Sequence, residues 1–367
     1  MPDHETRSQA ASRPPRRKRS AVARVFITIG RALAVLLTTV LIVAVFLVAV
    51  CLGMTHGPSE NAKNLFVNSM DETSALKFVP RLFLPDEEVE AILHPVREQP
   101  APDTFRAIGL EPADGTTEEE PEATPLVQID ETNVTDELEV VDIRKATFKG
   151  KMLIVHDPSR VIVGTLDRWG GSGLYLWDFI DKYNAVAGTN AGSFEDPGGM
   201  GTGGIPDGLV MKDGLISYGS TSAYYTGVLG FDGDHVLHVG SMTGQEALDL
   251  GLVTAVSFPP GPTLIKDGVK LTNLGGGVNP RTCVGQRADG AVLIAVIEGR
   301  HPDSLGATYD DLADLMEEYG AVNAGNLDGG SSSAMIYNGE QITKGSNLIG
   351  ARPLATTILV LQEGESN

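Results

Sequence analysis

The clearest hydrophobic pattern lies near the start of the chain, where residues 32–54 contain no charged residue and consist mainly of Val, Leu, Ile and Ala. A helix of this length, rising about 1.5 Å per residue, is long enough to cross a bilayer. Basic residues precede the span and acidic residues follow it, which predicts an N-terminus in the cytoplasm. No small-residue cleavage motif ends the span, so an uncleaved anchor is favoured over a signal peptide.

The pattern then divides the rest of the chain. Residues 1–31 are polar and rich in Arg, and predict a basic cytoplasmic tail. Residues 55–98 have scattered apolar positions typical of one or two short helices, which we interpret as a membrane-proximal stalk. Residues 99–137 are rich in Pro, Glu and Thr and cannot bury a core, so they predict an acidic linker. The globular domain is predicted at 138–362, and a fragment starting near Glu137 is expected to fold alone.

Short apolar runs in the globular part are separated by turn dipeptides that favour hairpins. These are Asp213-Gly214, Asp232-Gly233, Asp267-Gly268, Asp289-Gly290 and Asn338-Gly339. Their number predicts a domain rich in antiparallel strands.

Two helices are expected between these strands. Thr308 begins one as an N-cap, Asp311 completes a capping box, and Gly320 ends it. The other covers Leu174 to Tyr183, with Leu174, Trp177 and Ile180 at helical spacing, and we expect this face, its aromatic residue included, to pack on a sheet.

Charge narrows the range of partners. The chain has 367 residues and a formal net charge of −20, although residues 1–31 hold eight basic and only two acidic side chains. The acidic excess therefore lies after the span, and such a surface argues against nucleic acid as a partner. Of the two cysteines, Cys51 belongs to the apolar span, which argues against an intramolecular disulfide framework.

Three polar stretches follow short apolar runs. They are TNAGSF (189–194), NPRTCVG (279–285) with IEGRH (297–301) closing the same hairpin, and NLDGGSSS (326–333). Functional groups often lie on loops at the rim of a rigid sheet, so we expect these stretches to form one site. The plainer interpretation of the last stretch is an Asp-Gly turn. One turn, however, does not require an Asp, two glycines and three serines together.

The side chains in these stretches suit an anionic sugar substrate. Arg281 and Arg300 offer forked donors for phosphate, and Asp328 and Glu298 are a candidate acid/base or nucleophile pair. Asn190 is a candidate donor to a sugar hydroxyl or a phosphate oxygen. Gly329, Gly330 and Ser331 bring a flexible backbone and a hydroxyl that a ligand can approach closely. A surface ion pair is the alternative role for Glu298 and Arg300.

Antiparallel pairing through the turn at Asp289-Gly290 should bring Arg281 and Arg300 to the same end of one hairpin. Two guanidinium groups so placed repel each other unless an anion lies between them. We expect Glu298 or Asp328 to supply that charge in the absence of substrate.

Motifs for several other chemistries are missing from the sequence. It has no HExxH or CxxC spacing for zinc, no G-x-S-x-G and no Walker-type GK[ST]. The expectation is therefore a site without a cofactor, although Ca²⁺ or Mg²⁺ bound by Asp, Asn and carbonyl oxygens stays open.

The ordered combination of three longer segments resembles the phosphodiester glycosidase family over roughly residues 138–362. The segments are NAGSF, NPRTCVGQRADGAVLIAVIEGR and SLGATYDDLADLMEEYGAVNAGNLDGGSSSAMIYNGE. The resemblance implies an α+β fold with mixed, largely antiparallel sheets and packed helices, here preceded by one transmembrane helix. It also implies hydrolysis of the bond between an anomeric carbon and a phosphodiester oxygen.

The polar motif positions of that family correspond to Asn190, Arg281, Thr282, Glu298, Arg300 and Asp328, with Gly329 and Gly330. This chain departs from the family in having Glu298 where many members have Asp, and Cys283 where a smaller residue is usual. The first departure leaves the role of Glu298 open, and the second is a matter of packing.

The sequence thus predicts a membrane-anchored extracytoplasmic hydrolase of a sugar-1-phosphodiester, acting on cell-envelope or exopolysaccharide material. Two alternatives stay open. One is a non-catalytic protein that binds an anionic envelope glycopolymer, and the other is a metal-dependent phosphodiesterase that cleaves the P–O bond.

Overall fold

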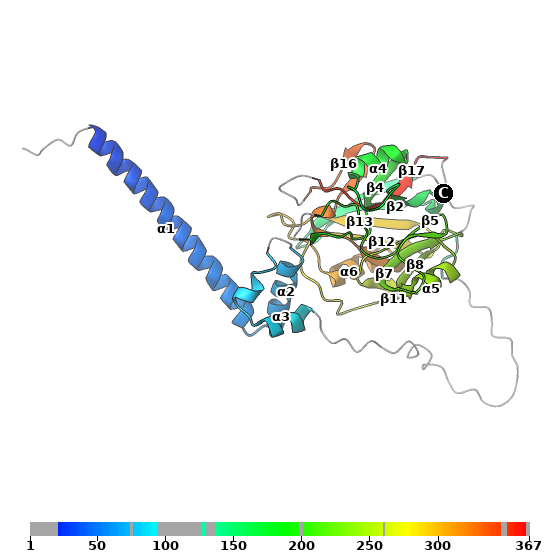
Figure 1. Cartoon of the computed structure of the whole chain (residues 1–367), viewed down its shortest axis with the longest axis horizontal. Coiled ribbons are helices and arrows are strands. Elements are labelled where there is room, and N and C mark those ends of the chain that lie inside the picture. Colours follow the sequence, from blue (N-terminus) through cyan, green and yellow to red (C-terminus); the bar gives the residue numbers. More distant parts are fainter. Residues whose placement is uncertain are drawn as a thin grey trace, which may run out of the picture. The chain divides into compact units, whose positions relative to one another are not determined.

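The computed structural model describes residues 21–73, 76–93, 126–129, 135, 137–197, 201–259, 261–345 and 351–364. The expected tail falls largely outside these residues, and so does most of the expected linker. The chain divides into two units, residues 1–57 and residues 58–367 (Figure 1).

The first unit is a single helix, α1 (Ala21–His56), whose segment Phe26–His56 is long and apolar enough to cross a membrane. By length and composition, such a helix near an N-terminus is either a membrane anchor or a signal sequence. The helix begins before the predicted span, and residues 21–31 contain no Pro that would interrupt it.

The second unit begins with two short helices, α2 (Glu60–Asp71) and α3 (Asp86–Leu93), joined through the 3-10 turn η1 (Pro80–Leu82). Ser59 caps α2 by accepting a hydrogen bond from the Ala62 N–H at 3.2 Å. The stalk predicted at 55–98 is therefore helical, and its described residues from 58 onward belong to the same compact unit as the strands.

The largest sheet has seven strands in the order β1-β2-β13-β12-β14-β10-β11. Their bounds are β1 (Leu138–Arg144), β2 (Lys149–Val155), β13 (Val292–Ile297), β12 (Arg281–Arg287), β14 (Ala321–Leu327), β10 (Thr263–Lys266) and β11 (Val269–Lys270). Every strand pair described in it is antiparallel. Strand β13 is buried at every position, as its continuous apolar sequence requires.

Two five-stranded sheets pack with it. One has the order β16-β15-β4-β17-β3, and the other β6-β5-β9-β7-β8. Their bounds are β16 (Glu340–Gln341), β15 (Met335–Tyr337), β4 (Ala185–Asn190), β17 (Thr356–Leu361), β3 (Val161–Thr165), β6 (Leu215–Tyr218), β5 (Val210–Lys212), β9 (Leu252–Ser257), β7 (Tyr224–Asp232) and β8 (Leu237–Thr243). One apolar core joins all three sheets through residues such as Ile294, Ile358 and Leu229.

The remaining helices cover the sheets. Helix α6 (Tyr309–Glu318) packs on the largest sheet, and α4 (Leu176–Lys182) and α5 (Gly244–Asp249) pack on the smaller ones. The predicted capping box of α6 is confirmed, with the Thr308 hydroxyl accepting from the Asp311 N–H at 3.1 Å. Helix α4 is confirmed, and its predicted face is correct in part. Ile180 is buried and Leu174 packs against the same core, but Trp177 is 40% exposed and Phe179 is the buried aromatic residue of the helix.

All five predicted turns join consecutive strands, β5–β6, β7–β8, β10–β11, β12–β13 and β15–β16. At three of them both turn residues have a positive φ, for example Asn338 at 49° and Gly339 at 74°. This is the conformation that Asn-Gly and Asp-Gly favour. The α+β class with antiparallel sheets is confirmed.

Candidate active site

Three strand ends meet at one edge of the molecule. Strand β12 starts where its antiparallel neighbour β14 ends, with Thr282 paired to Leu327. The next residue after β14, Asp328, donates its backbone N–H to the Ala191 carbonyl at 2.9 Å, which joins the end of β14 to the end of β4. The three polar stretches singled out in the sequence are thus brought together.

A cavity of about 1180 Å³ opens at this edge. Six of the predicted residues line it: Arg281, Arg300, Asp328, Gly329, Gly330 and Ser331. Asn190, Thr282 and Glu298 do not.

Asn190 and Thr282 lie fully buried beneath the cavity. The Asn190 side chain donates to the backbone carbonyl of Asp328 at 2.5 Å, and its oxygen accepts from the Thr282 hydroxyl at 2.9 Å. These two residues therefore hold the turn that carries Asp328 and do not face the cavity.

Glu298 is directed elsewhere. Its carboxylate accepts a hydrogen bond from the Lys344 N–H at 2.8 Å, and its carbonyl accepts from the Ser304 hydroxyl. This structure therefore does not bring Glu298 and Asp328 together as the expected pair.

Arg281 is held rigidly and is only 3% exposed. Its guanidinium carbon lies 4.0 Å from the centre of the Tyr309 ring, and its nitrogens donate to the carbonyls of Ala307 and Gly277 at 3.2 and 2.6 Å. None of these partners carries a negative charge. The positive charge of the Arg281 guanidinium is therefore available to bind an anion.

Arg300 is the second cation of the cavity. Its φ of 61° places it in the left-handed region, which a residue with a Cβ rarely adopts without a local reason. The turn that follows brings its side chain to Asn279, whose oxygen accepts from Nη2 at 3.1 Å. Arg281 and Arg300 therefore meet at one end of the hairpin, as the antiparallel pairing predicts.

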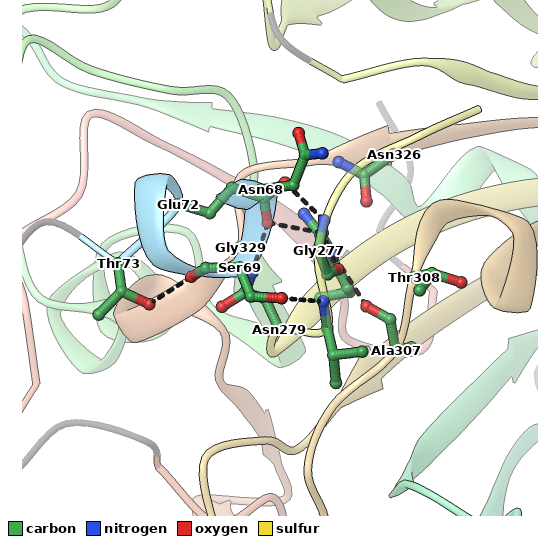
Figure 2. Close-up of polar contacts among 12 residues, drawn as sticks. Asn68, Ser69, Glu72, Thr73, Gly277, Asn279, Ala307, Thr308, Asn326 and Gly329 are labelled. Atoms are coloured by element: carbon green, nitrogen blue, oxygen red, sulfur yellow. Dashed lines mark hydrogen bonds and ion pairs between the residues drawn. The ribbon is translucent and has the colours of Figure 1, made fainter. Parts of the chain in front are cut away.

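The anion between the arginines comes from the stalk. Glu72, the C-cap of α2, accepts from Arg281 Nη2 at 2.6 Å, from Asn279 Nδ2 at 2.5 Å and from the Gly277 N–H at 3.1 Å. We call these three donors the anion cradle (Figure 2). The expectation that Glu298 or Asp328 supplies this charge is wrong. No sequence pattern pointed to Glu72, since nothing in the stalk indicates which domain surface it contacts.

Neighbouring stalk residues complete this contact. The Ser69 hydroxyl accepts from the Val278 N–H at 2.9 Å (Figure 2). Arg300 donates to the Thr73 hydroxyl at 3.2 Å. A Cβ on Gly277 would lie 2.3 Å from the Ser69 backbone nitrogen, so only glycine lets the two backbones approach this closely.

Asp328 faces the cavity from a desolvated position. Burial raises the pKa of its carboxyl to about 6, although hydrogen bonds from Ser332 and the Gly329 N–H oppose the rise. A carboxyl that titrates near neutrality is suited to proton transfer, as general acid/base catalysis requires.

A second ion pair lines the cavity, and sequence reasoning missed it. Arg352 donates to both oxygens of Asp196 at 2.7 and 2.8 Å. Asp196 follows the TNAGSF stretch by two residues, so its position just after a polar strand end was the signal available. In the part of the chain that is described, no three His, Cys, Asp or Glu side chains are grouped to hold a metal.

Part of the chain is similar to known proteins. Residues 183–361 match the family model described as phosphodiester glycosidase. The chain is 32% identical over 144 residues to an uncharacterised SPbeta prophage-derived protein, YomE, of Bacillus subtilis, a match that covers 37% of this chain and 22% of that protein. The alignment thus spans about a fifth of that relative's length.

Among solved structures, the fold is similar to the zebrafish N-acetylglucosamine-1-phosphodiester alpha-N-acetylglucosaminidase catalytic domain, described as auto-inhibited by its pro-peptide. The TM-score is 0.51 and the identity 20%, over 66% of this chain and 86% of the other. At this identity the likeness concerns the fold.

Proposed function

Because residues 183–361 match the phosphodiester glycosidase family model, we propose that this chain hydrolyses the glycosidic bond of a sugar-1-phosphodiester. We place the reaction outside the cytoplasm, on envelope or exopolysaccharide material, in a protein anchored by α1. The apolar helix and the basic residues before it support this location.

The observation that carries the proposal is the Glu72 carboxylate in the anion cradle. Its two oxygens accept from a guanidinium, an amide and a backbone N–H. A phosphodiester also presents two charged oxygens that accept such donors, so the cradle suits the phosphate of a substrate. Because the protein as a whole carries a net charge of −20, an anionic substrate needs these local cations.

Asp328 lines the same cavity as the cradle. In the proposed reaction water attacks the anomeric carbon, the C–O bond breaks, and its electron pair leaves with the phosphate oxygen. Arg281 and Arg300 stabilise the charge that develops on the departing phosphate. Asp328 acts either as a general acid that protonates the leaving oxygen or as a general base that accepts a proton from the attacking water. A catalytic role for Glu298 stays a prediction.

We further propose that the cavity is closed to substrate in this structure, because the stalk residue Glu72 lies in the anion cradle. The zebrafish relative is described as auto-inhibited by a pro-peptide. In this chain Glu72 occupies the donors that a substrate phosphate would need. The stalk helix α2 would therefore have to leave the cradle before substrate binds.

An isotope experiment tests the reaction and separates it from its alternatives. Full-length protein is incubated in H₂¹⁸O with α-N-acetylglucosamine 1-(methyl phosphate), and the products are analysed by mass spectrometry. Label in the sugar supports the proposal, since it reports C–O cleavage. Label in the phosphate would instead favour a phosphodiesterase.

A non-catalytic binding protein is the remaining alternative. It would show no turnover with a panel of sugar-1-phosphodiesters, either as wild type or as Gly277→Ala, the variant expected to displace α2. It would still bind the anionic glycopolymer. Saturable binding without turnover in both proteins would favour this alternative.

We propose that the reaction needs no metal, because the charges on the leaving phosphate are met by arginines. Turnover should persist after dialysis against EDTA. Loss of activity that Ca²⁺ or Mg²⁺ restores would overturn this part of the proposal.

A further inference from the structure

Asp196 and Arg352 form an ion pair in the cavity that the reaction as proposed does not use. They come from separate segments, Asp196 after β4 and Arg352 before β17. Two hydrogen bonds of 2.7 and 2.8 Å join the two side chains in a forked arrangement, and both are largely buried. This geometry fixes the plane of the guanidinium as well as its position.

Further contacts keep the pair in place. The Gly201 N–H donates to Asp196 Oδ1 at 2.6 Å, and the Arg352 guanidinium carbon lies 5.0 Å from the centre of the Phe194 ring. Arg352 Nη1 also lies 3.5 Å from the hydroxyl of Ser331, in the turn that carries Asp328.

The pair and Asp328 interact electrostatically. Arg352 favours the ionised form of Asp328 and Asp196 disfavours it. Burial opposes ionisation of Asp196 itself, but its hydrogen bonds from Arg352 and Gly201 outweigh this, and the pKa of Asp196 is lowered. The pair therefore carries one fixed positive and one fixed negative charge.

Other charged or titratable groups also line this cavity. They are Asp71, Glu72, Lys77, Arg281, Arg300 and Tyr309. Among them, Arg281 is already engaged with Glu72, and Arg300 with Asn279 and the stalk.

We propose that Arg352 is a positioning residue shared between two carboxylates: Asp196 holds its guanidinium against the turn of Ser331 that carries Asp328, and so sets the pH at which Asp328 exchanges its proton. Asp196 limits how strongly Arg352 can stabilise the Asp328 anion. Without Asp196 the full charge of Arg352 would act on Asp328, which would then stay ionised at a lower pH.

The proposal makes the two members of the pair act in opposite directions. Arg352→Gln removes the cation and leaves two carboxylates near each other, so Asp328 should titrate at higher pH. Asp196→Asn releases Arg352 toward Asp328, so Asp328 should titrate at lower pH. Each shift is expected to be about one pH unit or more. A pair with a merely structural role would move both variants in the same direction or not at all.

The direct measurement is ¹³C NMR of full-length protein in nanodiscs, with Asp carboxyls labelled and Asp328 assigned by its absence in Asp328→Asn. Opposite displacements of the Asp328 midpoint in the two variants support the proposal. Unchanged midpoints, or displacements of the same sign, overturn it. Arg352→Lys, which retains the charge, should stay closer to wild type than Arg352→Gln.

A second readout is the pH dependence of kcat/KM, whose limb set by Asp328 should move with the NMR midpoint. This readout rests on the proposed function, whereas the NMR readout does not. A failure of the proposed function can therefore be distinguished from a failure of the proposed role of Arg352. Arg287→Gln is a matched control, because Arg287 pairs with Asp289 in the β12–β13 turn and does not line the cavity. Thermal melting of each variant reports whether it has folded.

Discussion

At the scale of single residues, the site places a carboxyl where its charged form is unfavourable. Burial is the main reason that the pKa of Asp328 rises from 3.8 to about 6. The raised pKa means that the folded state binds this proton more tightly than the unfolded state does. The contribution to stability is therefore fully present below pH 3.8 and is lost as the pH rises through 6.

Asp328→Asn should consequently be more stable than wild type at pH 8, by at most about 3 kcal/mol, and closer to wild type at pH 4. The same variant should lose turnover by orders of magnitude, because an amide cannot exchange the proton. Urea unfolding at both pH values and kcat measure the two effects. Asp181→Asn, a change at an exposed carboxylate on α4, is the control and should alter neither. A variant with full activity would remove Asp328 from the mechanism.

Arginine geometry gives the second prediction. Arg281→Lys and Arg300→Lys retain the charge but lose the planar fork, and should lower kcat/KM for a phosphodiester far more than for a neutral aryl glycoside of the same sugar. Assaying both substrates with each variant decides the matter. Equal losses on both would mean that the arginines support the fold or bind the sugar.

The sequence correctly predicted the positions of the residues that directly adjoin a strand end. Asp328, Arg281 and Arg300 each adjoin a recognisable strand, so antiparallel pairing places them at one edge. Glu72, Asp196 and Arg352 lie in segments whose sequence does not specify what they pack against. Glu298 also adjoins a strand, but its side chain does not line the cavity. The direction of a side chain just beyond a strand depends on the loop that packs against it.

At the scale of elements, local chemistry determined the turns and the capping of α6, and the structure follows both. The order of strands across three sheets depends on long-range pairing that no local pattern encodes. The docking of α2 likewise depends on contacts between residues far apart in the sequence. The helix has a good N-cap and a short apolar face, but its partner surface includes a loop more than 200 residues away in the sequence.

The close approach of α2 to Gly277 offers a way to open the site without altering its charges. In Gly277→Ala the added Cβ would collide with Ser69, so α2 should leave the cradle and kcat/KM should rise. Glu72→Gln should act in the same direction, because it removes the anion. Fluorescence of a dye on the stalk reports the movement alongside the rate.

Two matched variants control for nonspecific effects. Gly233→Ala adds the same methyl group in a turn with room for it, and Glu87→Gln removes a charge from an exposed position on α3. Both should behave as wild type. If Gly277→Ala frees the stalk but kcat/KM falls, α2 assists the reaction and does not block it.

At the scale of the whole molecule, the first question is topology. The basic residues before the apolar span predict that everything after about residue 55 lies outside the cytoplasm. Protease added to intact cells should therefore remove the C-terminal domain, detected with a C-terminal tag. Complete protection in intact cells, with digestion after lysis, would contradict this orientation.

The last prediction concerns how the stalk and the globular domain stay associated. The sequence favoured a boundary near residue 138, whereas residues 58–367 form one compact unit in which Ser69, Glu72 and Thr73 bond the domain directly. A protease site inserted between residues 100 and 120 lets these contacts be tested without the covalent link.

After cleavage in membranes at low salt, the domain should stay with the stalk and sediment with the membrane. High salt should release part of it, because the contact includes the ion pair between Glu72 and Arg281. Gly277→Ala should release it at low salt, while Gly233→Ala should not. Immediate release of the wild-type domain on cleavage would mean that the stalk binds too weakly to close the cavity, and the closed state proposed above would then be wrong.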